Sequence, residues 1–125
     1  MTEGDVQATI RIEAAKSGFI LWRNNSGALT DVAGRLVRYG LGNDSPSVNK
    51  VLKSSDLIGI GPYGRMLAVE CKPSNWKYNG SDRERAQLTF INIVKARGGY
   101  ACFATCWADV VCCLVEGVKS DGQSA

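Results

Sequence analysis

Two apolar segments separated by a short turn constrain the fold of this chain most strongly. Residues 56–60 read Asp-Leu-Ile-Gly-Ile, and residues 65–72 read Arg-Met-Leu-Ala-Val-Glu-Cys-Lys. The four residues between them, Gly-Pro-Tyr-Gly, have the composition of a tight turn. The pattern predicts a β-hairpin. The continuous apolar run at residues 66–69 further predicts that its second strand is buried on both faces.

Charged residues stand at the open end of this predicted hairpin. Antiparallel pairing brings the start of the first strand beside the end of the second, so Asp56 should lie near Glu70 and Lys72. Side chains alternate along a strand, which places Glu70 and Lys72 on one face and Cys71 on the other. Two adjacent carboxylates repel each other unless a cation lies between them. A surface salt-bridge cluster of Asp56, Glu70 and Lys72 is the alternative interpretation.

The donor types at this end suit a hard divalent cation. Carboxylates of Asp56 and Glu70, together with the backbone carbonyl of Cys71, offer the oxygen ligands that Mg²⁺ and Mn²⁺ prefer. The ammonium group of Lys72 can steady a developing anion or position a water molecule beside the cation. The sequence therefore predicts a metal site with a lysine next to it.

The flanking segments predict an α/β fold. Helical spacing and capping patterns predict helices over residues 2–17, from the capping-box pattern Ser81-Asp82-Arg83-Glu84 to Gly98-Gly99, and over 108–116. Residues 19–22 and 100–106 read as strands, 35–39 as a short strand or extended arm after a turn, and 40–55 and 74–80 as loops. We expect a single domain over residues 1–118, with a small mixed sheet flanked by helices, and a flexible tail over 119–125.

The residue types present exclude several classes of protein. The chain has no histidine, which rules out Ser-His-Asp and Cys-His catalysis. Its five cysteines include no C-x2-C pair, so a zinc site or a disulfide framework is not expected, and the thiols are interpreted as buried and inert. No apolar run approaches the roughly 20 residues that span a bilayer, and the acidic N-terminus lacks a signal-peptide pattern. We expect a cytoplasmic protein without a membrane partner.

Basic residues are concentrated in the loops around the acidic end of the hairpin. The net charge is only +3, but this distribution favours a polyanionic partner whose chemistry needs a cation. A solvated basic surface is the alternative. Trp76 and Tyr78 could stack on unpaired bases, or could pack against the helix that follows them. The candidate DNA contacts are Arg23, Asn24, Arg35, Arg38, Lys50, Lys53, Lys77 and Arg83.

The motif formed by Asp56 and by Glu70-Cys71-Lys72 resembles the PD-(D/E)XK nuclease signature. Its surroundings resemble the virus-type replication-repair nuclease (VRR-NUC) branch of that superfamily, over nearly the whole chain. The matching features are Glu3-x-x-x-Gln7, Arg23-Asn24-Asn25-Ser26-Gly27-Ala28, Gly34-Arg35-Leu36-Val37-Arg38-Tyr39-Gly40, Ser55-Asp56-Leu57-Ile58-Gly59, Glu70-Cys71-Lys72, Gln87 and Gly98-Gly99-Tyr100.

This resemblance implies a restriction-endonuclease-like core and Mg²⁺- or Mn²⁺-dependent cleavage of DNA. Stand-alone, phage-encoded members are expected to be homodimers that act on branched DNA such as Holliday junctions, in the cytoplasm of a bacterial or phage-infected cell. By resemblance, Glu3 completes the acidic site, with Glu13 as a second choice, and Gln87 hydrogen-bonds to the lysine, a water molecule or DNA. Two other functions stay open: a restriction-type or general duplex endonuclease, and a nonenzymatic DNA-binding module whose acidic cluster is incidental.

Overall fold

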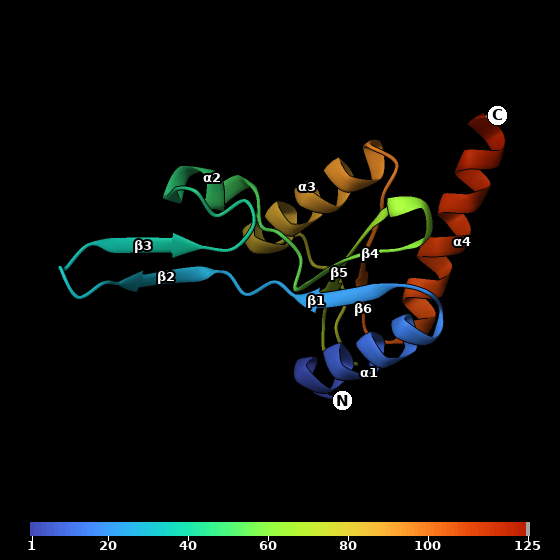
Figure 1. Ribbon diagram of the computed structural model, residues 1–125, viewed down its shortest axis with the longest axis horizontal. Helices are drawn as coiled ribbons and strands as arrows, with labels where there is room; N and C mark the ends of the chain where they lie inside the picture. Colours follow the sequence, from blue (N-terminus) through green and yellow to red (C-terminus); the bar gives the residue numbers. More distant parts are fainter. Residues whose placement is uncertain (125) are drawn as a thin grey trace.

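The computed structural model describes residues 1–124, with side chains through residue 117. Helices and strands alternate irregularly along the chain (Figure 1). The elements are α1 (Glu3–Lys16), β1 (Ile20–Arg23), β2 (Gly27–Thr30), β3 (Leu36–Tyr39), α2 (Pro46–Val51), β4 (Leu57–Ile60), a 3-10 turn (Pro62–Gly64), β5 (Met66–Cys71), α3 (Asp82–Ala96), β6 (Tyr100–Ala104) and α4 (Trp107–Ser124).

The predicted hairpin forms the centre of a four-stranded sheet with the strand order β1-β4-β5-β6. Strand β4 pairs antiparallel with both β1 and β5, whereas β5 and β6 run parallel. Leu67, Ala68 and Val69 of β5 are fully buried, which confirms that this strand is covered on both faces. The expected small mixed sheet flanked by helices is therefore confirmed.

Helices cover the two faces of the sheet unequally. Helices α1 and α4 pack on one face, where Val6 and Ile10 join Leu57 and Val69 in the larger hydrophobic core. Helix α3 packs on the other face against β5 and β6, with Ile91 beside Ala68 in a smaller core. On that second face, β1 and β4 carry side chains that stay exposed to solvent.

A capping box fixes the start of α1. The Thr2 hydroxyl accepts a hydrogen bond from the Asp5 backbone N–H, and the Asp5 carboxylate accepts one from the Thr2 N–H, each at 3.2 Å. Two N–H groups that the helix leaves unpaired are thereby satisfied. Because Glu3 lies in this first turn, the cap also holds its backbone in place.

Strands β2 and β3 form a hairpin separate from the main sheet, and this hairpin, here called the arm, extends away from the body (Figure 1). The sequence predicted the second strand of the arm but not the first. The expectation of a loop over residues 40–55 is wrong in part, because α2 lies within it. Ser45 caps α2 by accepting a hydrogen bond from the Val48 N–H, and Pro46 occupies the first turn, where its missing N–H is not needed.

The C-terminal helix is longer than the sequence indicated. Helix α4 begins at Trp107 and its backbone remains helical to Ser124, whereas the pattern predicted 108–116. The sequence predicted a flexible tail over residues 119–125. Ala125 lies outside the described residues, and the flexibility of this tail stays a prediction. No helix among the described residues combines the length and apolar character needed to cross a membrane.

Candidate metal centre and adjoining groove

Three carboxylates converge at one end of the sheet. Glu3, Asp56 and Glu70 each place an oxygen within 4.8 Å of the other two. Asp56 immediately precedes β4, Glu70 lies near the end of β5, and Glu3 reaches the same point from the first turn of α1. The predicted convergence of Asp56 and Glu70 is confirmed. Glu13, the second choice for the third carboxylate, instead pairs with Lys16 at 3.2 Å on the surface of α1.

Backbone hydrogen bonds of the hairpin orient two of these carboxylates. The Asp56 N–H donates to Glu70 Oε2 at 3.2 Å, and the Cys71 N–H donates to Asp56 Oδ2 at 3.0 Å. Leu57 and Val69 are register partners, so Asp56 and Glu70 lie opposite each other one step further along the two strands. The site is therefore preorganised by strand pairing.

Lys72 is connected to Glu70 through the side chain of Gln87. Lys72 Nζ donates to Gln87 Oε1, and Gln87 Nε2 donates to Glu70 Oε1, both at 2.9 Å. All three side chains are buried, and Gln87 comes from α3. Lys72 Nζ also lies 5.7 Å from the Trp76 ring centroid, a cation–π contact. Lys72 and Gln87 thus lie beside Glu70, and their catalytic roles stay a prediction.

The carboxylates crowd one another. Burial, and the nearby charge of Asp56, raise the pKa of Glu70 to about 8. The same two causes raise the pKa of Glu3. Such shifts mark charges that lack compensation, and a divalent cation bound by carboxylate oxygens supplies it. The three oxygens fit Mg²⁺ or Mn²⁺ by ligand type.

Cys71 does not offer its sulfur to this site. Its side chain is fully buried in the larger core, and burial and the charge of Asp56 both raise the pKa of its thiol. The thiol is therefore protonated and points away from the carboxylates, in line with strand alternation. Coordination by the Cys71 carbonyl oxygen stays a prediction.

A groove of about 720 Å³ opens beside the carboxylates. Asp56, Glu70 and Gln87 line it together with four of the predicted DNA contacts, which are Asn24, Arg38, Lys53 and Arg83. Burial, and the neighbouring charges of Arg83 and Arg38, lower the pKa of Lys53. The three cations repel one another, so the groove favours an anionic ligand such as a phosphate chain.

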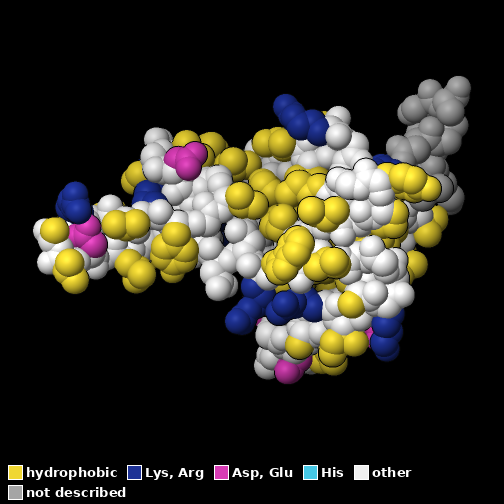
Figure 2. Space-filling view, viewed as in Figure 1, with side chains coloured by type: hydrophobic (Ala, Val, Ile, Leu, Met, Phe, Trp, Pro, Cys, Tyr) yellow, Lys and Arg dark blue, Asp and Glu magenta, His cyan; other side chains and the backbone are white. Residues whose placement is uncertain are grey.

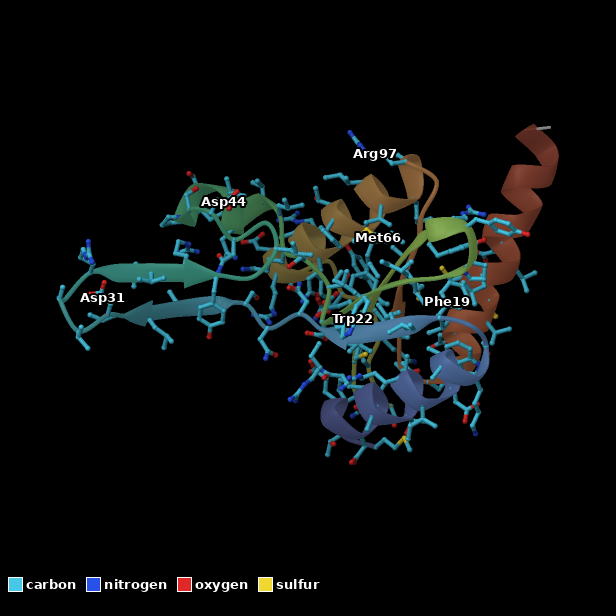
Figure 3. All side chains as sticks on the ribbon, in the orientation of Figure 1. Phe19, Trp22, Asp31, Asp44, Met66 and Arg97 are labelled. Atoms are coloured by element: carbon cyan, nitrogen blue, oxygen red, sulfur yellow. The ribbon has the colours of Figure 1, made fainter. Side chains whose placement is uncertain are left out.

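The remaining predicted contacts lie outside this groove. Arg35 pairs with Asp31 at 3.2 Å at the end of the arm, where Asp31 is labelled in Figure 3. Lys50 lines a second hollow between α2 and α3. Arg23 on β1 and Lys77 in the loop that follows β5 are exposed and do not line the main groove.

Two asparagines hold the groove together: Asn24, which the sequence marked only as a candidate DNA contact, and Asn43, which it did not mark. The Asn43 amide is buried and donates to the carbonyls of Gly27 and Tyr39, both at 2.9 Å, while its Oδ1 accepts from Arg38 at 2.6 Å. Asn24 donates to the hydroxyl of Ser54 at 2.8 Å. Asn43 thereby fixes the root of the arm. Its only sequence signal was its place in a long polar loop.

Glu84 has a different role from the predicted capping box. The Ser81 hydroxyl caps α3 by accepting from the Glu84 N–H at 3.2 Å. The Glu84 carboxylate turns back to the preceding loop, where Trp76 Nε1 and the Asn79 N–H donate to it at 3.0 and 2.8 Å. These hydrogen bonds, that of Asn79 foremost, lower the pKa of Glu84. A capping box would also have the Glu84 carboxylate accept a hydrogen bond from the Ser81 N–H. This part of the prediction is wrong, because Trp76 and Asn79 compete successfully for the carboxylate.

The loop aromatics mainly pack against the protein. The Trp76 ring lies 5.0 Å from that of Phe103 on β6, between centroids, and its N–H is used by Glu84. The sequence left open base stacking or packing against the helix that follows. Trp76 packs, but its ring lies against Phe103 of β6, and the helix only accepts its N–H through Glu84. Tyr78 packs on Phe103 at 5.9 Å and remains 45% exposed.

The arrangement combines an acidic, oxygen-rich centre, a buried ammonium group held beside it, and a cationic groove leading to both. Such a centre can bind a divalent cation, and such a groove can bind a phosphate chain. No protein-family model, curated protein or solved structure matches this chain.

Proposed function

We propose that this chain is a Mg²⁺- or Mn²⁺-dependent endodeoxyribonuclease of the PD-(D/E)XK superfamily, with a restriction-endonuclease-like core of the VRR-NUC type. The observation that carries this proposal is the convergence of Glu3, Asp56 and Glu70 beside Lys72, at the side of a groove lined by three cations. A salt-bridge cluster does not need three carboxylates within 4.8 Å of one another. A divalent cation bound by carboxylate oxygens accounts for their proximity.

The residues divide the chemistry among them. Asp56, Glu70 and Glu3 would hold the cation. When bound, this ion lowers the pKa of a water molecule and offsets the charge that develops on the phosphate. Lys72 points its ammonium group into the same region and orients the attacking water or the scissile phosphate. Gln87 keeps Lys72 and one oxygen of Glu70 in place, since it hydrogen-bonds to both.

The groove supplies binding without reading sequence. Arg38, Lys53 and Arg83 would contact phosphates, which fixes the position of the DNA but carries no base information. The proposed preference is therefore for DNA structure, with branched DNA such as a Holliday junction as the substrate. A junction has two-fold symmetry, so a homodimer with two matched sites suits it.

Cleavage of a four-way junction, compared with linear duplex of the same sequence, tests the proposal. We expect Mn²⁺- or Mg²⁺-dependent cleavage of the junction that EDTA abolishes. Asp56→Asn and Lys72→Ala should remove cleavage while DNA binding survives. Glu13→Gln, which alters a carboxylate outside the cluster, serves as the matched control and should cleave normally.

Each alternative gives a different result in this assay. Equal cleavage of junction and linear duplex indicates a general endonuclease. Metal-independent binding without cleavage, by the unaltered chain, indicates a nonenzymatic DNA-binding module. Normal cleavage by Asp56→Asn would refute the assignment of the site.

A further inference from the structure

The five cysteines of the chain have very different surroundings. Cys71 is fully buried, Cys102 and Cys113 are partly buried, and Cys106 and Cys112 are exposed. The interpretation of the thiols as buried is therefore wrong for all except Cys71. All five are free thiols. A thiol that reaches solvent can react, whereas one enclosed in an apolar core is inert, so the accessible thiols need a closer description.

The periodicity of one strand and one helix brings Cys102 and Cys113 together. Side chains alternate along β6, so Cys102 shares a face with Tyr100 and Ala104, which belong to the larger core. On α4, Val110 is fully buried in that core, and Cys113 follows it by three residues on the same face of the helix. Helix α4 packs directly on β6. Both thiols therefore point into the layer between the strand and the helix.

The two thiols are in contact. Cys102 and Cys113 are hydrogen-bonded to each other through their side chains. The Cys113 thiol also donates to the Ala101 carbonyl at 3.4 Å, which holds its sulfur against the strand residue next to Cys102. Two sulfurs in contact can form a disulfide once one of them is oxidised, because the second sulfur can then attack the first.

Only one of these sulfurs faces an opening. A hollow of about 190 Å³ is lined by Cys113 but not by Cys102, and Arg65 and Lys95 line it as well. The hydrogen bond with Cys102, supported by the charge of Lys95 and opposed by that of Glu116, lowers the pKa of Cys113. The same hydrogen bond, together with burial, raises the pKa of Cys102. Cys113 is thus the accessible nucleophile, and Cys102 is the protonated thiol behind it.

This hollow is separate from the groove beside the carboxylates, and the two share no lining residue. Arg65 precedes β5 and Gly99 precedes β6, whereas Glu70 lies near the other end of β5. Helix α4 forms the right-hand edge of the molecule in Figure 1, and Figure 2 shows hydrophobic side chains, a class that there includes cysteine, along the same edge. The hollow therefore lies at the opposite end of the sheet from the candidate metal centre.

We propose that Cys113 and Cys102 form a reversible redox pair, in which hydrogen peroxide oxidises Cys113 and Cys102 converts the product to a disulfide. A reactive, accessible thiol beside a second, resolving thiol is the arrangement of a redox-sensing site. The disulfide links α4 covalently to the sheet, and a thiol reductant restores both thiols. This inference rests on the cysteines alone and holds whether or not the chain cleaves DNA.

The proposed reaction has two steps. In the first, the Cys113 sulfur attacks one peroxide oxygen, so an S–O bond forms, the O–O bond breaks, and an electron pair passes from sulfur to peroxide. The leaving hydroxide takes up the Cys113 proton and becomes water. In the second, the Cys102 sulfur attacks the Cys113 sulfenic acid, so the S–S bond forms and the S–O bond breaks. The second hydroxide leaves as water with the Cys102 proton.

Peroxide oxidation of the reduced full chain, followed by mass spectrometry, tests this inference. A background with Cys106→Ser and Cys112→Ser removes the two exposed thiols that could react in its place. We expect the intact mass to fall by two hydrogen atoms and to return on treatment with dithiothreitol. Chymotryptic digestion should yield linked peptides, because Phe103 and Trp107 lie between the two cysteines. Cys71, in the core, should remain a free thiol.

Serine variants in this background assign the two roles. Cys102→Ser should form no disulfide, and dimedone should capture a sulfenic acid at Cys113. Cys113→Ser should form neither a disulfide nor a dimedone adduct at Cys102. Peroxide added to the chain unfolded in guanidinium is the matched control. It should lose the preference for Cys113, because the contacts that distinguish the thiols are then absent.

Every other outcome overturns the inference. No loss of thiols in the folded chain excludes the redox pair, and a disulfide that includes Cys71 excludes the proposed partners. A dimedone adduct on Cys102 in Cys113→Ser reverses the roles. The same preference in the unfolded chain excludes the fold as its cause. Circular dichroism checks folding, and Cys102→Ala or Cys113→Ala replaces any serine variant that does not fold. Because the readout is thiol chemistry, it is independent of nuclease activity.

Discussion

The backbone N–H of Asp56 donates to the Glu70 carboxylate at 3.2 Å, so the peptide that carries one carboxylate orients the other. Both residues belong to one hairpin, and their separation is set by strand pairing rather than by flexible loops. The cluster therefore exists before any cation binds. Its cost is electrostatic, because Glu70 is buried beside a second carboxylate.

This crowding predicts an unusual dependence of stability on pH. Glu70 has an ordinary pKa near 4.5 when the chain is unfolded and a pKa of about 8 when it is folded, so the folded state keeps this proton to a higher pH. Without divalent cations, the free energy of unfolding should fall as pH rises from about 4.5 to 8. Urea unfolding across this range, with Glu70→Gln as the reference, measures it. If the free energy of unfolding of the unaltered chain instead rises with pH relative to that of Glu70→Gln, the raised pKa of Glu70 is contradicted.

Added Mg²⁺ or Mn²⁺ should reverse that trend. Cation binding requires ionised carboxylates, so the stabilisation by metal is expected to increase with pH through the same range. Melting temperatures measured at pH 6 and pH 8, each with and without Mn²⁺, test this. Asp56→Asn should lose the metal effect, whereas Glu13→Gln, outside the cluster, should keep it.

Gln87 offers a test of how the lysine is positioned. Gln87→Ala removes the hydrogen-bond partner of both Lys72 Nζ and Glu70 Oε1, leaving a buried ammonium and a buried carboxylate without it. Losses of such outer partners cost about 10–100-fold in metal affinity or activity. We expect a decrease of that order in cleavage rate and in Mn²⁺ affinity by calorimetry. Asn92→Ala, on the exposed side of α3, is the matched control, and an equal loss there would indicate a general effect on the helix.

The sequence was sufficient where the rules are local. Strand alternation and antiparallel pairing placed Asp56 beside Glu70 and turned Cys71 into the core. Helical spacing predicted a helix over residues 2–17, and Val6, Ile10 and Ala14 form the buried face of α1. These inferences need only the periodicity of one or two elements.

The sequence was insufficient where groups far apart in the chain compete for the same partner. Helix α2 is only six residues long and lies within a Gly- and Asn-rich stretch. It packs against α3, and no local sequence pattern reveals this packing. Glu84 has the spacing of a capping box, but the Trp76 and Asn79 donors take its carboxylate. The role of Asn43 depends on Gly27, which lies 16 residues earlier and reaches it only through the fold of the arm.

Asn43 should contribute mainly to the local stability of the arm rather than to that of the main sheet. Asn43→Ala leaves the carbonyls of Gly27 and Tyr39 without this buried donor, at a cost of about 1–3 kcal/mol. We expect faster amide hydrogen exchange in β2 and β3, with exchange in β4 and β5 little changed. Asn75→Ala, in an exposed loop, should alter neither. Uniformly faster exchange throughout the sheet would show that Asn43 supports the whole fold instead.

The salt dependence of DNA binding separates groove cations from other surface cations. Lys53→Gln or Arg83→Gln should each weaken binding and reduce the slope of log K against log salt by about 1, as expected for one lost phosphate contact. Lys77→Gln removes the same charge from an exposed loop outside the groove, so it should leave the slope unchanged. Fluorescence anisotropy with a Ca²⁺-containing buffer or with the Asp56→Asn variant measures binding without cleavage. If all three variants reduce the slope equally, net charge rather than the groove determines where DNA binds.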